Sequence, residues 1–114
     1  MNSAAEVPLE IDVQAVKELQ TAGEPFYFLD CREPDEYETA SIAGAELIPM
    51  GEINDRLAQL EPYRNSRIIV HCHHGRRSLN VTHALRQAGF PQTQSMAGGI
   101  DAWSLEIDPS VPRY

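Results

Sequence analysis

The sequence predicts a single α/β domain with a mainly parallel, five-stranded sheet flanked by helices. Strand and helix patterns alternate along all 114 residues, which is typical of strands joined by helical crossovers. The segments 26–29 and 68–71 are almost entirely apolar, as expected of strands buried on both faces. The length suffices for one hydrophobic core and not for two. We therefore expect residues 1–114 to form one domain.

The five expected strands are short runs of strand-forming residues bounded by turn or helix signals. They cover residues 9–11, 26–29, 45–48, 68–71 and 93–96. Pro49 is expected to close the third strand. A Gly-Phe-Pro turn at 89–91 leads into the fifth.

The first three helices are predicted from their capping residues and apolar spacing. Asp12 is expected to cap the first helix and Gly23 to end it. Pro34 opens a short second helix with an acidic first turn, where the helix dipole favours negative charge. The third helix has apolar residues at helical spacing between 53 and 60 and is expected to end at Pro62.

Two more helices flank the last strand. One is expected to begin at about Ser78 and to run to Ala88, and the other follows Gly98-Gly99 and carries Trp103, which we interpret as a packing residue. The tail 108–114 contains two prolines and is expected to run extended over the surface.

Composition excludes several classes of partner. A net charge of −8 and a pI near 4.8 argue against nucleic acid or an anionic membrane as the main partner. No apolar run approaches the roughly 20 residues of a membrane span. Residues 1–6 lack the pattern of a signal peptide, and two cysteines are too few for a disulfide scaffold. We therefore expect a cytoplasmic protein with free thiols.

The most informative segment is 71–78, His-Cys-His-His-Gly-Arg-Arg-Ser, which follows an apolar strand and precedes a helix. A helix that begins just beyond the loop directs unpaired N–H groups and the positive end of its dipole at the Cys72 sulfur. Both favour the thiolate, which is the nucleophilic form of cysteine. Cys72 is therefore the candidate nucleophile.

Four segments together resemble the rhodanese-like sulfurtransferase family in order and spacing. They are Leu29–Tyr37, Ile42–Ala45, Cys72–Ser78 and Gly98–Trp103. The resemblance spans almost the whole chain and implies a single rhodanese-like domain. The stretch from Trp103 to Tyr114 is also similar to rhodanese domains fused to enzymes that activate ubiquitin-like sulfur carriers. In such enzymes, the equivalent of Cys72 takes a sulfane sulfur, holds it as a persulfide and passes it to a nucleophilic acceptor.

The resemblance also implies site residues and partners. Residues around the sulfur are expected to bind substrate, namely His73, His74, Gly75, Arg76, Arg77 and Ser78. Gly75 suits a tight turn, and the two arginines supply positive charge for an anionic donor. Asp30 and Arg32 match a polar pair beside the loop, for which a structural ion pair and a catalytic role both stay open. The expected partner is thiosulfate or a similar small anion, or a protein persulfide donor or sulfur acceptor, and no cofactor is implied.

Two other functions are weighed against sulfur transfer. Phosphatases and arsenate reductases of this fold place five residues between the cysteine and an arginine, which would require arginine at Ser78. Here Arg77 closes a loop one residue shorter, which leaves less room around a tetrahedral oxyanion. A non-catalytic or regulatory module that binds a protein partner is the second alternative, and the intact cysteine and paired arginines count against it.

The other cysteine and the histidines have plain structural interpretations. Cys31 is expected to be a small buried residue. The alternative is a resolving thiol, since Cys31 and Cys72 end strands that are neighbours in the family. The run 71–74 does not predict a zinc site, because zinc ligands are generally spaced apart and come from separate segments. We expect no metal.

Overall fold

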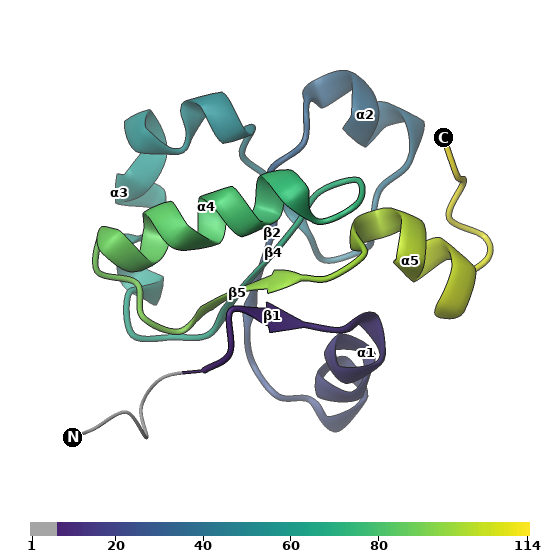
Figure 1. Ribbon diagram of the computed structural model, residues 1–114, viewed down its shortest axis with the longest axis horizontal. Coiled ribbons are helices and arrows are strands. Elements are labelled where there is room, and N and C mark those ends of the chain that lie inside the picture. The colour runs from purple at the N-terminus through teal and green to yellow at the C-terminus, as the bar shows by residue number, and fades with distance from the viewer. Residues whose placement is uncertain (1–6) are drawn as a thin grey trace.

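The computed structural model describes residues 7–114 and contains a five-stranded, entirely parallel sheet in the order β1-β5-β4-β2-β3 (Figure 1). The strands are β1 (Glu10–Ile11), β2 (Tyr27–Asp30), β3 (Glu46–Leu47), β4 (Ile68–His71) and β5 (Thr93–Met96). The predicted fold class is confirmed.

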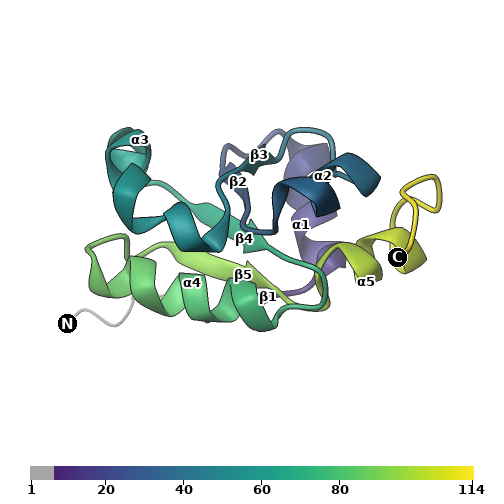
Figure 2. The ribbon, with the colours of Figure 1, turned by 90° about the horizontal axis from the view of Figure 1, so that it is seen from above.

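Helices cover both faces of this sheet (Figure 2). They are α1 (Val13–Ala22), α2 (Pro34–Thr39), α3 (Leu57–Leu60), α4 (Arg76–Gln87) and α5 (Gly99–Glu106). On one face, Val16 of α1 and Trp103 of α5 pack against Phe28 of β2 in one core cluster. On the other face, α3 and α4 pack in a second cluster, which contains both Cys31 and Cys72. The candidate nucleophile therefore lies on the α4 face.

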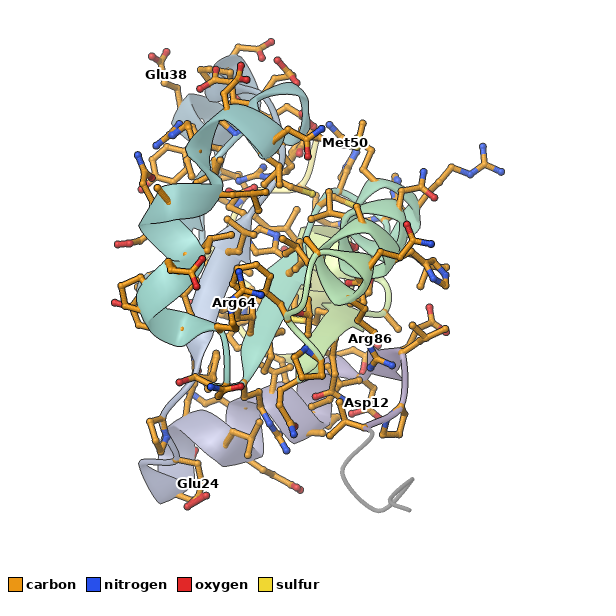
Figure 3. All side chains as sticks on the ribbon, turned by 90° about the vertical axis from the view of Figure 1, so that its left-hand side faces the viewer. Asp12, Glu24, Glu38, Met50, Arg64 and Arg86 are labelled. Carbon is orange, nitrogen blue, oxygen red and sulfur yellow. The ribbon has the colours of Figure 1, made fainter. Side chains whose placement is uncertain are left out.

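Side-chain hydrogen bonds hold the N-terminal part of the described chain, and the sequence predicts only one of them. The Asp12 carboxylate accepts a hydrogen bond from the Ala15 amide at 2.8 Å, which confirms it as the cap of α1. The Arg86 guanidinium binds the carbonyls of Val7 and Pro8 at 2.7 and 3.0 Å. Figure 3 shows Arg86 beside the start of the described chain. These contacts fix the edge strand β1 beside β5.

The prediction of one continuous third helix is wrong. The segment consists of short 3-10 turns at Met50–Glu52, Asn54–Arg56 and Glu61–Tyr63, with only α3 between them. Ile53 and Leu60 are nevertheless buried, as the apolar spacing predicts. Because 3-10 turns also return side chains to one face about every third residue, this spacing does not distinguish them from an α-helix. Pro62 lies within the last turn rather than beyond a helix.

Two further boundaries differ from expectation. Helix α4 begins at Arg76, two residues before the expected start, so that Arg76, Arg77 and Ser78 form its first turn. The tail turns at Asp108–Ser110 and buries Val111, whose carbonyl accepts a hydrogen bond from Ser104 at 2.5 Å. An apolar anchor therefore holds the tail against α5.

Within residues 7–114, no helix is long and apolar enough to cross a membrane. The signal-peptide argument concerns residues 1–6, which lie outside the described residues, and the cytoplasmic location stays a prediction.

Candidate active site

Cys72 lies directly after β4, and the start of α4 surrounds its sulfur. Gly75 is the cap of α4, with φ of +111°. This angle suits glycine, which carries no Cβ. The amides of Gly75 and Ser78 donate hydrogen bonds to Sγ of Cys72 at 3.1 and 3.3 Å. The helix terminus therefore places two donors on the sulfur, as the sequence predicts.

A pair of serines completes this side of the sulfur. The Ser78 hydroxyl lies 3.4 Å from Sγ of Cys72 and 2.7 Å from the hydroxyl of Ser95 in β5. Both serines are fully buried. The sequence gives Ser78 but not Ser95, because nothing local marks a strand serine as a neighbour of a helix 17 residues earlier.

Cys31 lies beside Cys72 at the end of the neighbouring strand. Asp30 of β2 pairs with His71 of β4, and the Cys31 amide then donates to the His71 carbonyl at 3.1 Å. Both cysteines belong to the core cluster on the α4 face, so their side chains lie on the same side of the sheet. Cys31 and Cys72 are 0% and 1% exposed, so their two sulfurs form a pair shielded from solvent.

The two thiols have opposite acidities. The hydrogen bond from Cys31, followed by those from the Ser78 hydroxyl and the Ser78 and Gly75 amides, lowers the pKa of Cys72 to about 4, although burial opposes this. Three causes raise the pKa of Cys31 far above its ordinary value. The interaction with Cys72 is the largest, and burial and the nearby Asp30 carboxylate add to it. At neutral pH the pair therefore holds one thiolate and one thiol.

The first turn of α5 holds the loop from the other side. The Ile100 and Asp101 amides donate to the carbonyls of Cys72 and His73 at 2.9 and 3.1 Å. A Cβ on Gly99 would overlap both of these carbonyl oxygens. The absence of a side chain at Gly99 therefore permits this close approach of α5 to the cysteine loop.

Arg77 is bound to a carboxylate. Its guanidinium contacts both oxygens of Glu36 in α2 at 2.7 and 3.0 Å. This contact lowers the pKa of Glu36 to about 2. The Tyr114 hydroxyl also donates to Glu36 at 2.8 Å. The expected positive charge at the loop is thus balanced, while Arg76 is exposed.

Aromatic rings lie beside the loop. The Tyr114 ring stacks on His73 with centroids 3.9 Å apart and planes 6° apart, and His74 stacks on His73 at the same distance. The side chain of His74 is 66% exposed. The His73 ring is therefore packed between Tyr114 of the tail and the exposed His74.

The polar pair of Asp30 and Arg32 is a buried ion pair. The Arg32 guanidinium contacts both Asp30 oxygens at 3.0 and 2.7 Å and donates to the carbonyl of Ala40 at 2.7 Å. Neither side chain is exposed, and Tyr114 accepts a further hydrogen bond from Arg32. These contacts fix the turn after β2 and do not reach the Cys72 sulfur, which favours the structural role.

His71 and His83 have different surroundings. His71 is fully buried in β4, and burial lowers its pKa, so its ring is neutral 3.6 Å from Asp30. His83 is exposed on α4. Neither histidine makes a described contact with the Cys72 sulfur, in line with the structural interpretation.

One group of possible metal ligands lies among the described residues. The ligand atoms of His73, His74 and Asp101 lie within 4.8 Å of one another. However, the Asp101 carboxylate is bound by Arg113 at 2.9 Å. A cation would have to displace that guanidinium, so the group does not fit a metal well.

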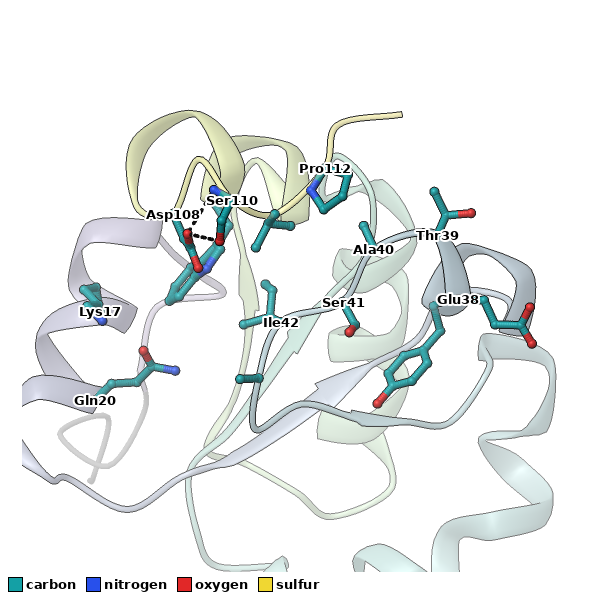
Figure 4. Close-up of a pocket in the computed structure, with 14 residues that line it drawn as sticks. Lys17, Gln20, Glu38, Thr39, Ala40, Ser41, Ile42, Asp108, Ser110 and Pro112 are labelled. Atoms are coloured by element: carbon teal, nitrogen blue, oxygen red, sulfur yellow. Dashed lines mark hydrogen bonds between the residues drawn. The ribbon is translucent and has the colours of Figure 1, made fainter.

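A surface pocket of about 490 Å³ lies away from the cysteine loop. Figure 4 shows it between Lys17 and Gln20 of α1, the segment 38–42 and the tail residues Asp108 and Pro112. No residue of the loop lines this pocket.

Comparison with known proteins identifies the family. A model of the rhodanese-like domain matches residues 12–106. The chain belongs to the rhodanese-like domain family. The solved structure of a rhodanese-related protein from Thermoplasma volcanium, 32% identical, superposes with a TM-score of 0.78 and covers 94% of this chain and 100% of that one.

Two further relatives carry sulfurtransferase names. "Adenylyltransferase and sulfurtransferase MOCS3-1" of Zea mays is 31% identical over 109 residues, which make up 91% of this chain and 23% of the maize protein. A solved thiosulfate sulfurtransferase of Pseudomonas aeruginosa is 34% identical with a TM-score of 0.76, over 84% of this chain and 18% of that one. The chain spans less than a third of the length of the curated plant relatives it matches.

Proposed function

We propose that this rhodanese-like chain is a sulfurtransferase that carries a sulfane sulfur as a persulfide on Cys72. The observation that carries the proposal is the set of donors at one sulfur, with the amides of Gly75 and Ser78 at 3.1 and 3.3 Å. A thiolate held by such donors attacks a sulfur readily and later leaves readily. A group carrier needs both properties.

The cycle has two displacement steps. First, the Cys72 thiolate attacks the sulfane sulfur of the donor. A new S–S bond forms, and the old bond breaks with its electron pair leaving on sulfite, when the donor is thiosulfate, or on a thiolate, when the donor is a protein persulfide. Second, a nucleophilic acceptor attacks the outer sulfur, and Cys72 leaves as the thiolate. Neither step needs a cofactor.

The remaining loop residues support these steps. The amides that hold the thiolate also stabilise the anionic persulfide. His73 and His74 lie where a donor or acceptor approaches, and Arg76 provides an exposed positive charge. Arg77 lies in the first turn of α4 but binds Glu36, so a donor anion gains the full charge of Arg77 only by competing with that carboxylate. Asp30 and Arg32 support the neighbouring turn.

Protein partners are supported by the family. The maize relative combines adenylyltransferase and sulfurtransferase in its name, which is in keeping with a protein sulfur donor or acceptor for this chain. The net charge of −8 disfavours nucleic acid or an anionic membrane as the partner. We propose thiosulfate and a protein persulfide as the two donor classes.

The loop disfavours phosphatase and arsenate reductase activity. A phosphatase or arsenate reductase loop of this fold needs an arginine where this chain has the buried Ser78. The preceding Arg77 binds both oxygens of Glu36. Phosphate in the loop would therefore meet no unpaired guanidinium from Arg77.

Intact-mass measurement after incubation with thiosulfate tests the proposal. The chain should gain one sulfur atom and lose it again when cyanide is added, because cyanide is a small nucleophilic acceptor. The Cys72→Ser variant should gain none. Sulfur uptake by the Cys72→Ser variant, or no uptake by the unmodified chain from either thiosulfate or glutathione persulfide, would reject a Cys72 carrier.

A further inference from the structure

Cys31 takes no covalent part in the proposed transfer cycle, yet it lies beside the nucleophile. The pairing of Asp30 with His71, and the bond from the Cys31 amide to the His71 carbonyl, continue the β2–β4 ladder to the two cysteines. Strands in a sheet lie about 4.8 Å apart, which is within the Cα separations of about 4.4 to 6.8 Å that disulfides span. The backbone therefore already brings these residues within bonding range.

The two side chains lie on the same face of the sheet. Both cysteines belong to the core cluster on the α4 face, and the Cys31 thiol makes the largest contribution to lowering the pKa of Cys72. Cys31 is completely buried, so reagents in solvent do not reach its sulfur. The sulfur of Cys72 is therefore the reaction partner that the structure offers to Cys31.

We propose that Cys31 resolves the Cys72 persulfide by forming a Cys31–Cys72 disulfide and releasing the sulfane sulfur as hydrosulfide. This inference rests on the proposed persulfide function. It adds an activity, sulfane-sulfur reduction, to sulfur transfer.

The step balances within the pair. The proton of the Cys31 thiol moves to the outer, negatively charged sulfur of the persulfide. The Cys31 sulfur then attacks Sγ of Cys72, the bond between Sγ and the outer sulfur breaks, and HS⁻ leaves with the electron pair. The two cysteine sulfurs are oxidised to a disulfide and the sulfane sulfur is reduced to sulfide. A dithiol reductant then reopens the disulfide and restores both thiols.

The acidity of the two thiols suits this order of events. The pKa of Cys31 is raised while it donates to the Cys72 thiolate, so the free pair does not contain two competing nucleophiles. Once Cys72 carries the outer sulfur, the negative charge moves to that atom, and the Cys31 proton has a new acceptor. Cys31 thus becomes reactive only in the loaded state.

The test follows a loaded chain under anaerobic conditions without an acceptor. The protein is loaded with thiosulfate, freed of excess donor and sampled for intact mass, released sulfide and linked peptides. The unmodified chain should first show one added sulfur atom. It should then release one equivalent of sulfide and end two hydrogen atoms lighter than the reduced chain, with a peptide linking Cys31 to Cys72.

The Cys31→Ser variant is the matched control. Its hydroxyl still donates to the Cys72 sulfur but does not form a disulfide, so its persulfide should survive at least about tenfold longer, without sulfide release. Equal decay in both proteins, a stable persulfide in the unmodified chain, or disulfides only between separate chains would overturn the inference. Failure of every protein to gain sulfur is seen at the loading step, and it rejects the proposed function itself together with the inference.

Discussion

The turn after β4 and the turn after β2 both begin with a buried cysteine, and they give that cysteine opposite properties. After β4, the chain enters the 12-residue helix α4, and two amides of this loop and helix are directed at the Cys72 sulfur. After β2, the Cys31 amide and carbonyl bind His71 and Met50, and no described amide is directed at its sulfur. The difference indicates that the donors around a sulfur, here the Cys31 thiol together with the loop hydroxyl and amides, rather than burial decide whether a cysteine is a thiolate.

Exchanging each cysteine for serine gives the largest expected contrast. Cys72→Ser should lower thiosulfate:cyanide transfer on the order of a thousandfold or more, because the hydroxyl neither ionises nor carries sulfur. Cys31→Ser should lower it by no more than about tenfold, since a hydroxyl still donates to Cys72. The measurement is initial rate over a range of thiosulfate concentrations. If Cys31→Ser were the inactive variant, the nucleophile would be misassigned.

The support of the Cys72 loop by α5 gives the next effect. Gly99→Ala should destabilise the fold by roughly 2 to 4 kcal/mol, because its Cβ would overlap the carbonyls of Cys72 and His73. Gly23→Ala is the control, since Gly23 also has a positive φ but an added Cβ meets no atom within 4 Å. It should cost about 1 kcal/mol. Urea unfolding compares the two variants. Equal losses in the free energy of unfolding would mean that α5 can move away from the cysteine loop at little cost.

Removing the Cys31 thiol should bring the pKa of Cys72 closer to that of an ordinary thiol. In the unmodified chain, iodoacetamide alkylation of Cys72 should have its midpoint near pH 4, following the pKa of about 4. Cys31→Ala removes the largest contribution to this lowering and should raise the midpoint by about one to two units. Ser78→Ala should raise it less, because the Ser78 hydroxyl contributes less than the Cys31 thiol to lowering the pKa of Cys72. A midpoint in the unmodified chain near the usual thiol value of about 8.5 would contradict activation by the loop.

The smallest effect concerns the charge beside the Cys72 loop. Glu36→Gln removes a carboxylate from Arg77, so the KM for thiosulfate should fall by about two- to fivefold while kcat changes little. Arg77→Ala should raise the KM instead. A change of KM in the same direction in both variants would show that the ion pair acts only on the fold.

The same variant tests the pH dependence of the ion pair. The pKa of Glu36 is lowered to about 2 in the fold, so the pair stabilises the fold fully above pH 4.5 and this contribution is lost as pH falls through 2. The difference in free energy of unfolding between the unmodified chain and Glu36→Gln should therefore be constant above about pH 5 and shrink below it. Denaturant unfolding at several pH values measures it.

Much of the fold, and the candidate nucleophile, can be predicted from local sequence signals. The alternation of apolar strands and helices predicts the parallel sheet, Asp12 and Gly23 predict the ends of α1, and a cysteine between an apolar strand and a helix predicts an activated thiol. The segment 50–63 is the largest exception, because its apolar spacing fits 3-10 turns as well as a helix.

The surroundings of the candidate nucleophile were decided by tertiary structure. Cys31 meets Cys72 because β2 and β4 are neighbours in the sheet, Ser95 reaches Ser78 because α4 packs on β5, and Glu36 meets Arg77 across 41 positions in the chain. Local periodicity fixes which face of an element a side chain occupies, but it does not state which element covers that face. Strand order and helix packing supply that information, because they depend on the burial of the whole apolar surface at once.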